Sequence, residues 1–268
     1  MKEISFDISG QTAVITGAGG IICGVMAKEM ARKGVRVALL DLFVDKAQQV
    51  VDEIRAEGGT AIAVKANVLD KASLEQAREE VLKEFGSVDI LVNGAGGNKA
   101  QAELSFFDLD LDAFKWVFDL NVTGAVLTTM VFGELLAKQG YGNVINIASM
   151  ASYHPLTNTV AYCGAKAAVA NFTEWMAVHF NKNYSTNIRV NAIAPGFLLT
   201  TQNQFLMQKE DGTPTDRGQR VLDKTPMARY GQPEEMAGAV IWLCSDAASF
   251  VNGAVIPIDG GFSAFWGI

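Results

Sequence analysis

Apolar runs alternate with helical segments along the whole of this 268-residue chain. Seven runs read as strands: TAVITG (12–17), VRVALLD (35–41), TAIAVKANV (60–68), VDILVNGAG (88–96), NVINIAS (143–149), IRVNAIAPG (188–196) and AVIPIDGG (254–261). The second run is β-branched and does not alternate, which indicates a strand buried on both faces. Such strands are typical of parallel sheets.

Segments with helical patterns separate these strands. They cover 21–33, 45–57, 71–85, about 112–139, about 162–181 and about 233–245. The alternation predicts βαβ units and an α/β fold, a doubly wound, seven-stranded parallel sheet with helices on both faces. Since no low-complexity linker divides the chain, residues 1–268 are expected to form a single domain.

One long irregular segment interrupts this pattern. Residues 197–232 are rich in glutamine, glycine, threonine and aspartate. Compact domains seldom hold a loop of that length without a use for it, so we expect it to cover a ligand. The alternative is a surface excursion without a function.

Composition excludes several classes of partner. The net charge is −7 and no run of lysine or arginine occurs, which argues against nucleic acid. The cysteines, Cys23, Cys163 and Cys244, form neither a disulfide framework nor a zinc spacing, so we expect no metal and a cytoplasmic location. The polar N-terminus and the lack of an 18-residue apolar stretch predict no membrane contact.

The sequence TGAGG follows the first strand and opens a helix. Gly17, Gly19 and Gly20 would let a pyrophosphate approach the backbone, and the free N–H groups at Ile21 and Ile22 would face its charge. A plain strand-to-helix connection is the alternative.

The second strand ends in Asp41, 24 residues after Gly17, where a carboxylate can accept hydrogen bonds from both adenosine ribose hydroxyls. The same charge would repel a 2′-phosphate, and the turn holds no basic residue. The pattern favours NAD over NADP as cofactor.

A reaction centre is indicated by YCGAK. Tyr162 and Lys166 lie four residues apart on a predicted helix and so share one face. A close ammonium favours phenolate, and lowering the tyrosine pKa from about 10 to about 7 takes roughly 4 kcal/mol. Ser149 ends the fifth strand, at the sheet edge where doubly wound folds bind ligands.

Seven motifs in order give the chain a resemblance to the short-chain dehydrogenase/reductase family over its whole length. They are TGAGG, NGAG at 93–96, LN at 120–121, Ser149, YCGAK, PGFLLT at 195–200 and the closing GAVIPIDGG. The resemblance implies a Rossmann-like fold and an enzyme that interconverts alcohols and ketones with a nicotinamide cofactor. It also implies a homotetramer, or a homodimer, built from the helices after strands four and five.

The resemblance also implies roles for individual residues. Tyr162 would be the general acid/base, Lys166 would lower its pKa and hold the nicotinamide ribose, Ser149 would hold the reacting oxygen, and Asn121 would support a proton-relaying water. Cofactor contacts are implied, besides the glycine turn and Asp41, at Asn67, Val68, Asn93, Gly94, Ala95, Gly96, Pro195, Gly196 and Thr200.

The glycine turn departs from the family pattern TGxxxGxG. Ile21 and Cys23 stand where the family has glycine, which changes the surroundings of the pyrophosphate. Cys23 either packs in the core or is a reactive thiol at a helix N-terminus. This turn, together with NGAGGN, SFFDLD, VHF and DGGFSAF, is similar to the D-mannonate oxidoreductase (fructuronate reductase) branch.

That branch implies a sugar acid as the small-molecule substrate, D-fructuronate or D-mannonate. A carboxylate needs cationic or amide donors, and the candidates are Asn98, Lys99, Arg217 and Arg220. His154, five residues past Ser149, could meet a sugar hydroxyl. Each has the alternative of an ordinary surface or loop residue. A neutral polyol, sugar or other hydroxy compound is the other substrate class. A catalytically silent cofactor sensor is the other function class, and the four retained reaction-centre residues argue against it.

Overall fold

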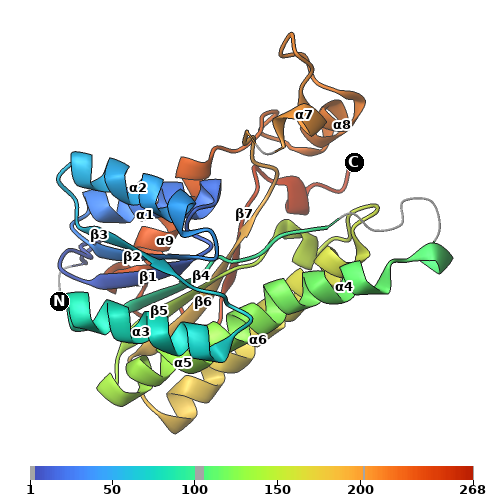
Figure 1. Cartoon of the computed structure of the whole chain (residues 1–268). Helices are drawn as coiled ribbons and strands as arrows, with labels where there is room; N and C mark the ends of the chain where they lie inside the picture. The colour runs from blue at the N-terminus through green and yellow to red at the C-terminus, as the bar shows by residue number, and fades with distance from the viewer. Residues whose placement is uncertain (1–3, 100–105, 202, 268) are drawn as a thin grey trace.

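A computed structural model of the chain describes residues 4–99, 106–201 and 203–267. Seven strands form one sheet in the order β3-β2-β1-β4-β5-β6-β7, and every neighbouring pair is parallel (Figure 1). The strands are β1 (Thr12–Thr16), β2 (Arg36–Asp41), β3 (Ala61–Lys65), β4 (Ile90–Asn93), β5 (Gly142–Ile147), β6 (Ile188–Pro195) and β7 (Val255–Ile258). The predicted doubly wound sheet is confirmed.

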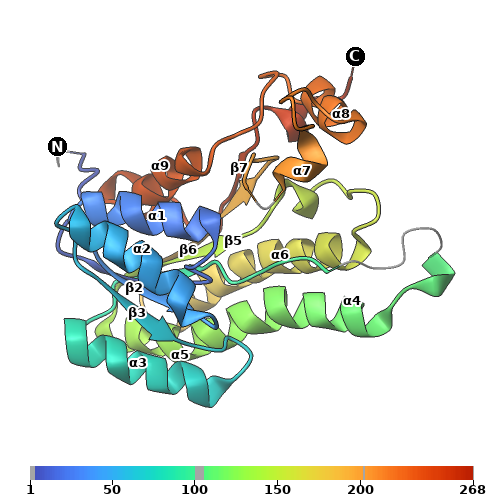
Figure 2. The same cartoon turned by 45° about the horizontal axis from the view of Figure 1, so that its top comes forward.

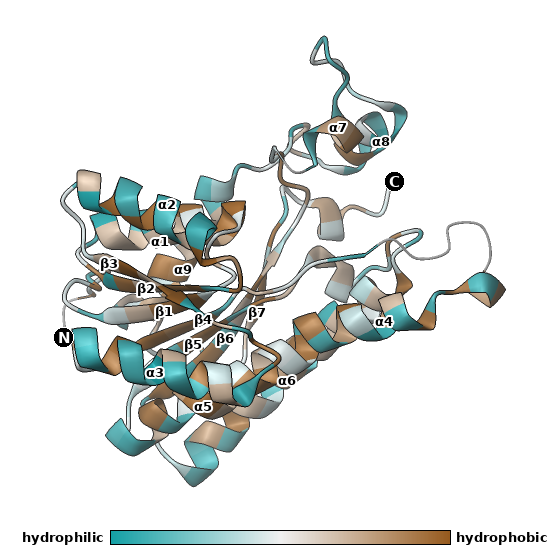
Figure 3. Cartoon of the chain, viewed as in Figure 1, coloured by the Kyte–Doolittle hydropathy of each residue, from teal (hydrophilic) through white to brown (hydrophobic). Residues whose placement is uncertain are grey.

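Helices cover both faces of the sheet (Figure 2). On one face lie α1 (Ile21–Arg32), α2 (Val44–Ala56) and α9 (Pro233–Cys244), and on the other lie α3 (Lys71–Phe85), α5 (Gly124–Gln139) and α6 (Val160–Asn183). The remaining helices are α4 (Leu111–Phe118), α7 (Gln204–Met207) and α8 (Asp216–Lys224). Each helix of the two layers buries an apolar stripe and turns polar residues outward (Figure 3).

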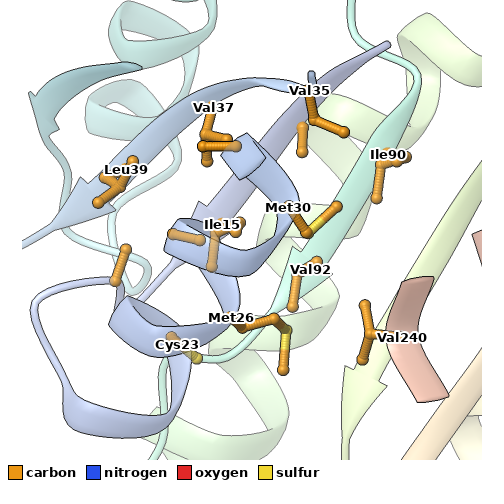
Figure 4. Close-up of a cluster of buried hydrophobic side chains, with 14 of the residues drawn as sticks. Ile15, Cys23, Met26, Met30, Val35, Val37, Leu39, Ile90, Val92 and Val240 are labelled. Atoms are coloured by element: carbon orange, nitrogen blue, oxygen red, sulfur yellow. The ribbon is translucent and has the colours of Figure 1, made fainter. Parts of the chain in front are cut away.

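The sheet divides the core in two, because successive side chains of a strand point to opposite faces. Along β1, Ala13 and Ile15 join the core under α1, whereas Val14 joins the core under α5. Met26 and Met30 of α1 lie over β1 and are fully buried (Figure 4). The same packing fixes the start of α1 above the end of β1.

The helical region 111–139 corrects the expectation that the chain lacks an 18-residue apolar stretch. It is 29 residues long with a mean hydropathy of 1.5 in its most apolar window, so by length and composition it could cross a membrane. Half of that window is buried, and α5 contacts β4, β5 and α3. These contacts explain the apolar composition as that of a core helix.

The segment 197–232 is more ordered than the sequence indicated. It contains α7 and α8, and Thr215 caps α8 by accepting a hydrogen bond from Gly218 N at 3.0 Å. Both views place α7 and α8 beyond the carboxyl ends of the strands, beside the C-terminus (Figures 1 and 2). The segment is therefore positioned to cover whatever binds at that edge.

Candidate active site

A cleft of about 880 Å³ opens at the carboxyl ends of the strands. From β1 the strand order runs through β2 to β3 on one side and through β4 to β7 on the other, so the order reverses between β1 and β4. Ligands of doubly wound sheets bind at such a topological switch point. The lining runs from the glycine turn and Asp41, past the ends of β4 and β5, to Tyr162 and Leu206.

The glycine turn is built for a close backbone approach. Gly17 has φ +66°, and a Cβ there would lie 2.8 Å from the Cα of Ala95. Gly20 is the N-cap of α1, and the first helical hydrogen bond runs from Gly24 N to Gly20 O at 2.8 Å. The amides of Ile21, Ile22 and Cys23, in the first turn, are therefore available to an anion at the helix N-terminus.

Asp41 is fixed by the backbone beside this turn. Its Oδ2 accepts from Gly19 N and its Oδ1 from Phe43 N, both at 2.9 Å. Each oxygen keeps a further lone pair for a ribose hydroxyl. The carboxylate thus ties the end of β2 to the glycine turn and lines the cleft.

Ser149 and Tyr162 meet at the other end of the cleft. Ser149 Oγ accepts from Ala151 N at 3.1 Å, so its hydroxyl hydrogen is free to be donated to the Tyr162 phenol, with which it forms a hydrogen bond. Burial raises the pKa of Tyr162, and the Ser149 hydrogen bond opposes that rise. In the chain by itself the pKa of Tyr162 is therefore raised, whereas a lowered one was expected from the sequence.

Lys166 is buried close to this pair. Its Nζ donates to Ile147 O at 2.7 Å and lies 5.6 Å from the centroid of the Tyr162 ring. Burial lowers the pKa of Lys166 to about 8. A Cβ on Gly96 would lie 3.3 Å from this Nζ, so the glycine gives the ammonium access to the cleft wall.

Asn121 lies in a π-helical turn, Asp119–Thr123, between α4 and α5. Its Nδ2 donates to Gly97 O at 2.7 Å and to Val117 O at 2.8 Å, and its Oδ1 accepts from Gly97 N at 3.3 Å. Such π-turns are frequent at functional sites. This one joins the loop after β4 to the helix that faces Tyr162.

Comparisons with known proteins agree with this geometry. A family model described as enoyl-(acyl carrier protein) reductase matches residues 17–263. UxuB, an uncharacterised oxidoreductase of Bacillus subtilis, is 48% identical over 281 aligned positions that cover 100% of both chains. The chain belongs to the short-chain dehydrogenase/reductase family.

Two further members of the family bear on the chemistry. A Haemophilus influenzae structure with bound NAD, under the provisional name D-mannonate oxidoreductase, is 45% identical with a TM-score of 0.91 over 98% of each chain. D-threitol dehydrogenase of Mycolicibacterium smegmatis is 32% identical over 262 residues, 97% of this chain and 96% of that one. The chain is accordingly a nicotinamide-dependent oxidoreductase of this family, and its similarity to the predicted branch is confirmed.

The family's implied cofactor residues divide in the structure. Most of them line the cleft: Gly17, Gly19, Gly20, Ile21, Ile22, Asp41, Asn67, Val68, Gly94, Ala95, Gly96, Tyr162, Pro195, Gly196 and Thr200. Asn93 lies behind the wall instead, where its Nδ2 donates to Thr129 Oγ1 at 2.9 Å and to Asn146 Oδ1 at 2.8 Å. Asn93 therefore holds the end of β4 in place and does not face a ligand in the cleft.

Cys23 shows how the family's glycine is replaced. A Cβ on Gly94 would overlap Cys23 Sγ and lie 2.7 Å from Thr16 O. The space that Cys23 takes at the turn is thus the space that Gly94 leaves open. Burial raises the pKa of Cys23 to about 12, which favours the packing alternative over a reactive thiol.

The predicted substrate residues do not come together in the cleft. Asn98 lines it, whereas His154 hydrogen-bonds to Ser263 O at 3.1 Å and is turned to the C-terminus. Arg217 and Arg220 are exposed on α8 and are not among the described residues that line the cleft.

Several cleft residues escaped the sequence analysis. Lys46, in the first turn of α2, lines the adenosine end with its Nζ 5.5 Å from the centroid of the Phe43 ring. Asn203 accepts from Thr200 N at 2.8 Å and donates to Leu198 O at 2.8 Å. Trp116 of α4 also lines the cleft. Of these residues, only Lys46 could have been predicted from the sequence, because it is a cation in the first helical turn after the strand that ends in Asp41.

Proposed function

We propose that the protein is an NAD(H)-dependent oxidoreductase that interconverts D-fructuronate and D-mannonate. The observation that carries the reaction type is the Ser149–Tyr162 hydrogen bond beside buried Lys166, at the end of a cleft whose other end holds Asp41. The glycines at 17 and 96 fit a dinucleotide, because both line the cleft and neither leaves room for a side chain: a Cβ would crowd Ala95 at the first and Asn121 at the second. NAD is favoured because Asp41 is fixed by two backbone amides and would repel a 2′-phosphate.

The residues divide the reaction between them. The cofactor, held in this cleft, would supply or accept the hydride through its nicotinamide ring. Ser149 holds the substrate oxygen, and Tyr162 gives it a proton during ketone reduction or removes one during alcohol oxidation. Lys166, close to Gly96 and Asn121, would hold the nicotinamide ribose and favour phenolate, while Asn121 would support a water that relays protons from solvent.

Support for a sugar acid comes from the Haemophilus influenzae relative at 45% identity. The carboxylate of a sugar acid requires a hydrogen-bond donor. Arg217 or Arg220 could supply a charge-assisted contact if the covering segment 197–232 moves toward the cleft. Replacing the arginine that turns inward by methionine should raise the KM for D-fructuronate about 10- to 150-fold, with a smaller change in kcat. The methionine variant of the other arginine serves as the matched control. If neither variant changes the KM for D-fructuronate, neither arginine binds the substrate.

One observation favours the alternative of a neutral polyol or sugar. Among the described residues that line the cleft, Lys46 is the only cation, and it lies at the adenosine end. Amides and hydroxyls of Asn98, Ser149 and Asn203 line the rest with Trp116 and apolar side chains. D-Threitol dehydrogenase, a relative, takes such a polyol by its name. A screen of NADH oxidation against hexuronates, ketoses and simple ketones separates the classes.

We also propose that the enzyme is a cytoplasmic homotetramer, or a homodimer, assembled through α5 and α6. An apolar groove of about 380 Å³ lies between these helices, with Met130, Trp175 and Phe172 in its lining. Met130 and Trp175 are more than half exposed in one copy. Three buried free cysteines support a reducing compartment. Light scattering of Trp175→Glu should show smaller particles than the parent, and an unchanged mass would refute this interface.

A further inference from the structure

The loop that carries Ser149 is fastened by three consecutive side chains, each to a different element. Ser152 Oγ donates to Lys166 O of α6 at 2.8 Å, and Tyr153 OH donates to Val255 O of β7 at 2.8 Å. His154 Nε2 lies 3.1 Å from Ser263 O. Because a carbonyl oxygen only accepts, this nitrogen must carry the hydrogen. The first two bonds join the loop to the core, and the third joins it to the C-terminus.

The C-terminal segment, residues 259–267, is a folded unit and not a loose tail. Asp259 accepts from Gly261 N at 2.9 Å and from Ser263 N at 2.8 Å. Gly260 and Gly261 take φ values of +64° and +87°, which residues with a side chain rarely adopt. The turn directs Ser263 O toward His154, and Trp266 meets the imidazole edge-on at 6.2 Å between ring centroids.

The same segment supports the far end of the covering segment 197–232. Met227 N donates to Gly260 O at 3.1 Å. A Cβ on Gly261 would lie 3.2 Å from Pro226 Cγ, so the backbone of Gly261 lies against the Pro226 ring. The end of α8 and the residues after it therefore rest on the C-terminal segment.

Phe262 carries the contact inward to the reaction centre. It lies 5.2 Å from Phe197 between ring centroids, and both rings belong to the apolar cluster around Met150 that also includes Tyr162. Phe197 and Met150 line the cleft. The C-terminal segment thus touches both the covering segment and the wall beside Tyr162.

We propose that His154 is a positioning residue for the substrate end of the cleft. Its imidazole holds the C-terminal segment against the Ser149 loop, and the C-terminal segment in turn holds the covering segment and Phe197 in place. His154 acts through these contacts and not by touching substrate, because its Nε2–H already donates to Ser263 O and His154 is not among the described residues that line the cleft. The inference rests on the proposed oxidoreductase function but not on the choice of a sugar acid.

The test compares His154→Ala with His154→Gln, whose amide nitrogen can still donate to Ser263 O. For the ketone that the NADH screen finds to be the best substrate, His154→Ala should raise KM about tenfold and leave the NADH Kd within about twofold. His154→Gln should restore most of the loss. Tyr153→Phe, which removes a bond of the same kind from the same loop to β7, should lower the Tm without that rise in KM.

Hydrogen exchange gives a readout that needs no substrate. In His154→Ala the amides of residues 259–267 and 225–228 should exchange faster, while residues 17–24 keep the parent rate. Unchanged exchange at 259–267 would show that His154 does not hold the segment. Faster exchange with an unchanged KM would overturn the positioning role. If no ketone is reduced, the proposed function fails while the exchange experiment still decides whether His154 holds the segment.

Discussion

Cys23 and Gly94 are sterically complementary across the phosphate turn and the end of β4. The Cys23 sulfur is where a side chain at Gly94 would have to be, so a family glycine missing from the turn is matched by a glycine in the facing loop. The cleft therefore keeps its shape with a side chain in an unusual place. The turn still ends on Gly20 and α1 still begins at Ile21.

Gly94→Ala should destabilise the fold by about 1–3 kcal/mol, because the new methyl group overlaps the Cys23 sulfur in a close-packed region. Gly94→Ala should also weaken NADH binding. Adding Cys23→Gly should recover part of the lost stability and part of the lost NADH affinity. Thermal unfolding and NADH titration measure both effects. Gly97→Ala is the control in the same loop, since its Cβ would meet only Leu120 Cδ2 at 3.7 Å. Equal losses in Gly94→Ala and Gly97→Ala would contradict the pairing.

Asp41 and Lys46 should oppose each other in cofactor choice. Asp41→Ala should reduce the preference for NADH over NADPH about 10- to 100-fold in kcat/KM, since it removes the ribose acceptor and leaves the Lys46 ammonium free to meet a 2′-phosphate. The double variant Asp41→Ala/Lys46→Met should lose the increase in kcat/KM for NADPH that Asp41→Ala gives. Steady-state kinetics with both cofactors measure these changes. A parent enzyme without a preference would refute the role of Asp41.

Tyr162→Phe removes the proton carrier and keeps the ring. Turnover should fall about 10²- to 10⁴-fold, while the NADH Kd stays near that of the parent. Because burial raises the pKa of Tyr162, alcohol oxidation by the parent should also quicken as pH rises toward that pKa. Kinetics from pH 6 to 10 and fluorescence titration of NADH provide the measurements. Turnover near the parent level would remove the phenol from the mechanism.

Lys166 should make stability depend on pH. Its pKa is lowered by burial from 10.5 to about 8, so between these values the unfolded chain binds a proton that the folded chain has released. Unfolding then takes up a proton, and stability rises with pH. Relative to Lys166→Met, the parent should gain up to about 3 kcal/mol between about pH 8 and 10.5. Urea unfolding of both proteins measures this, and a difference independent of pH would contradict the lowered pKa of Lys166.

The fold was predictable because its signals are local. Each strand of the sheet is a predominantly apolar run, and the glycine turn, Asp41, Ser149 and the YCGAK helix all follow strand ends or helical spacing. Their meeting at one sheet edge follows from parallel topology.

The remaining features depend on contacts between distant parts of the chain. The partner of His154 is 109 residues away, and Cys23 meets a glycine of another loop. The π-turn at Asn121 is tied to Gly97 by hydrogen bonds that no helical pattern announces. Asn93 follows the family motif, yet its partners Thr129 and Asn146 decide that it faces away from the cleft. None of these contacts leaves a periodic trace in the sequence.

The most direct test of the proposed function is the ratio of kcat/KM for D-fructuronate to kcat/KM for D-fructose, measured by NADH oxidation with the parent enzyme. The two ketoses differ in the terminal carboxylate, so their ratio isolates the group that a sugar-acid site must bind. We expect D-fructuronate to be preferred at least about 10-fold, the worth of one charge-assisted contact. Equal efficiency with D-fructose would contradict the sugar-acid assignment and favour a polyol dehydrogenase.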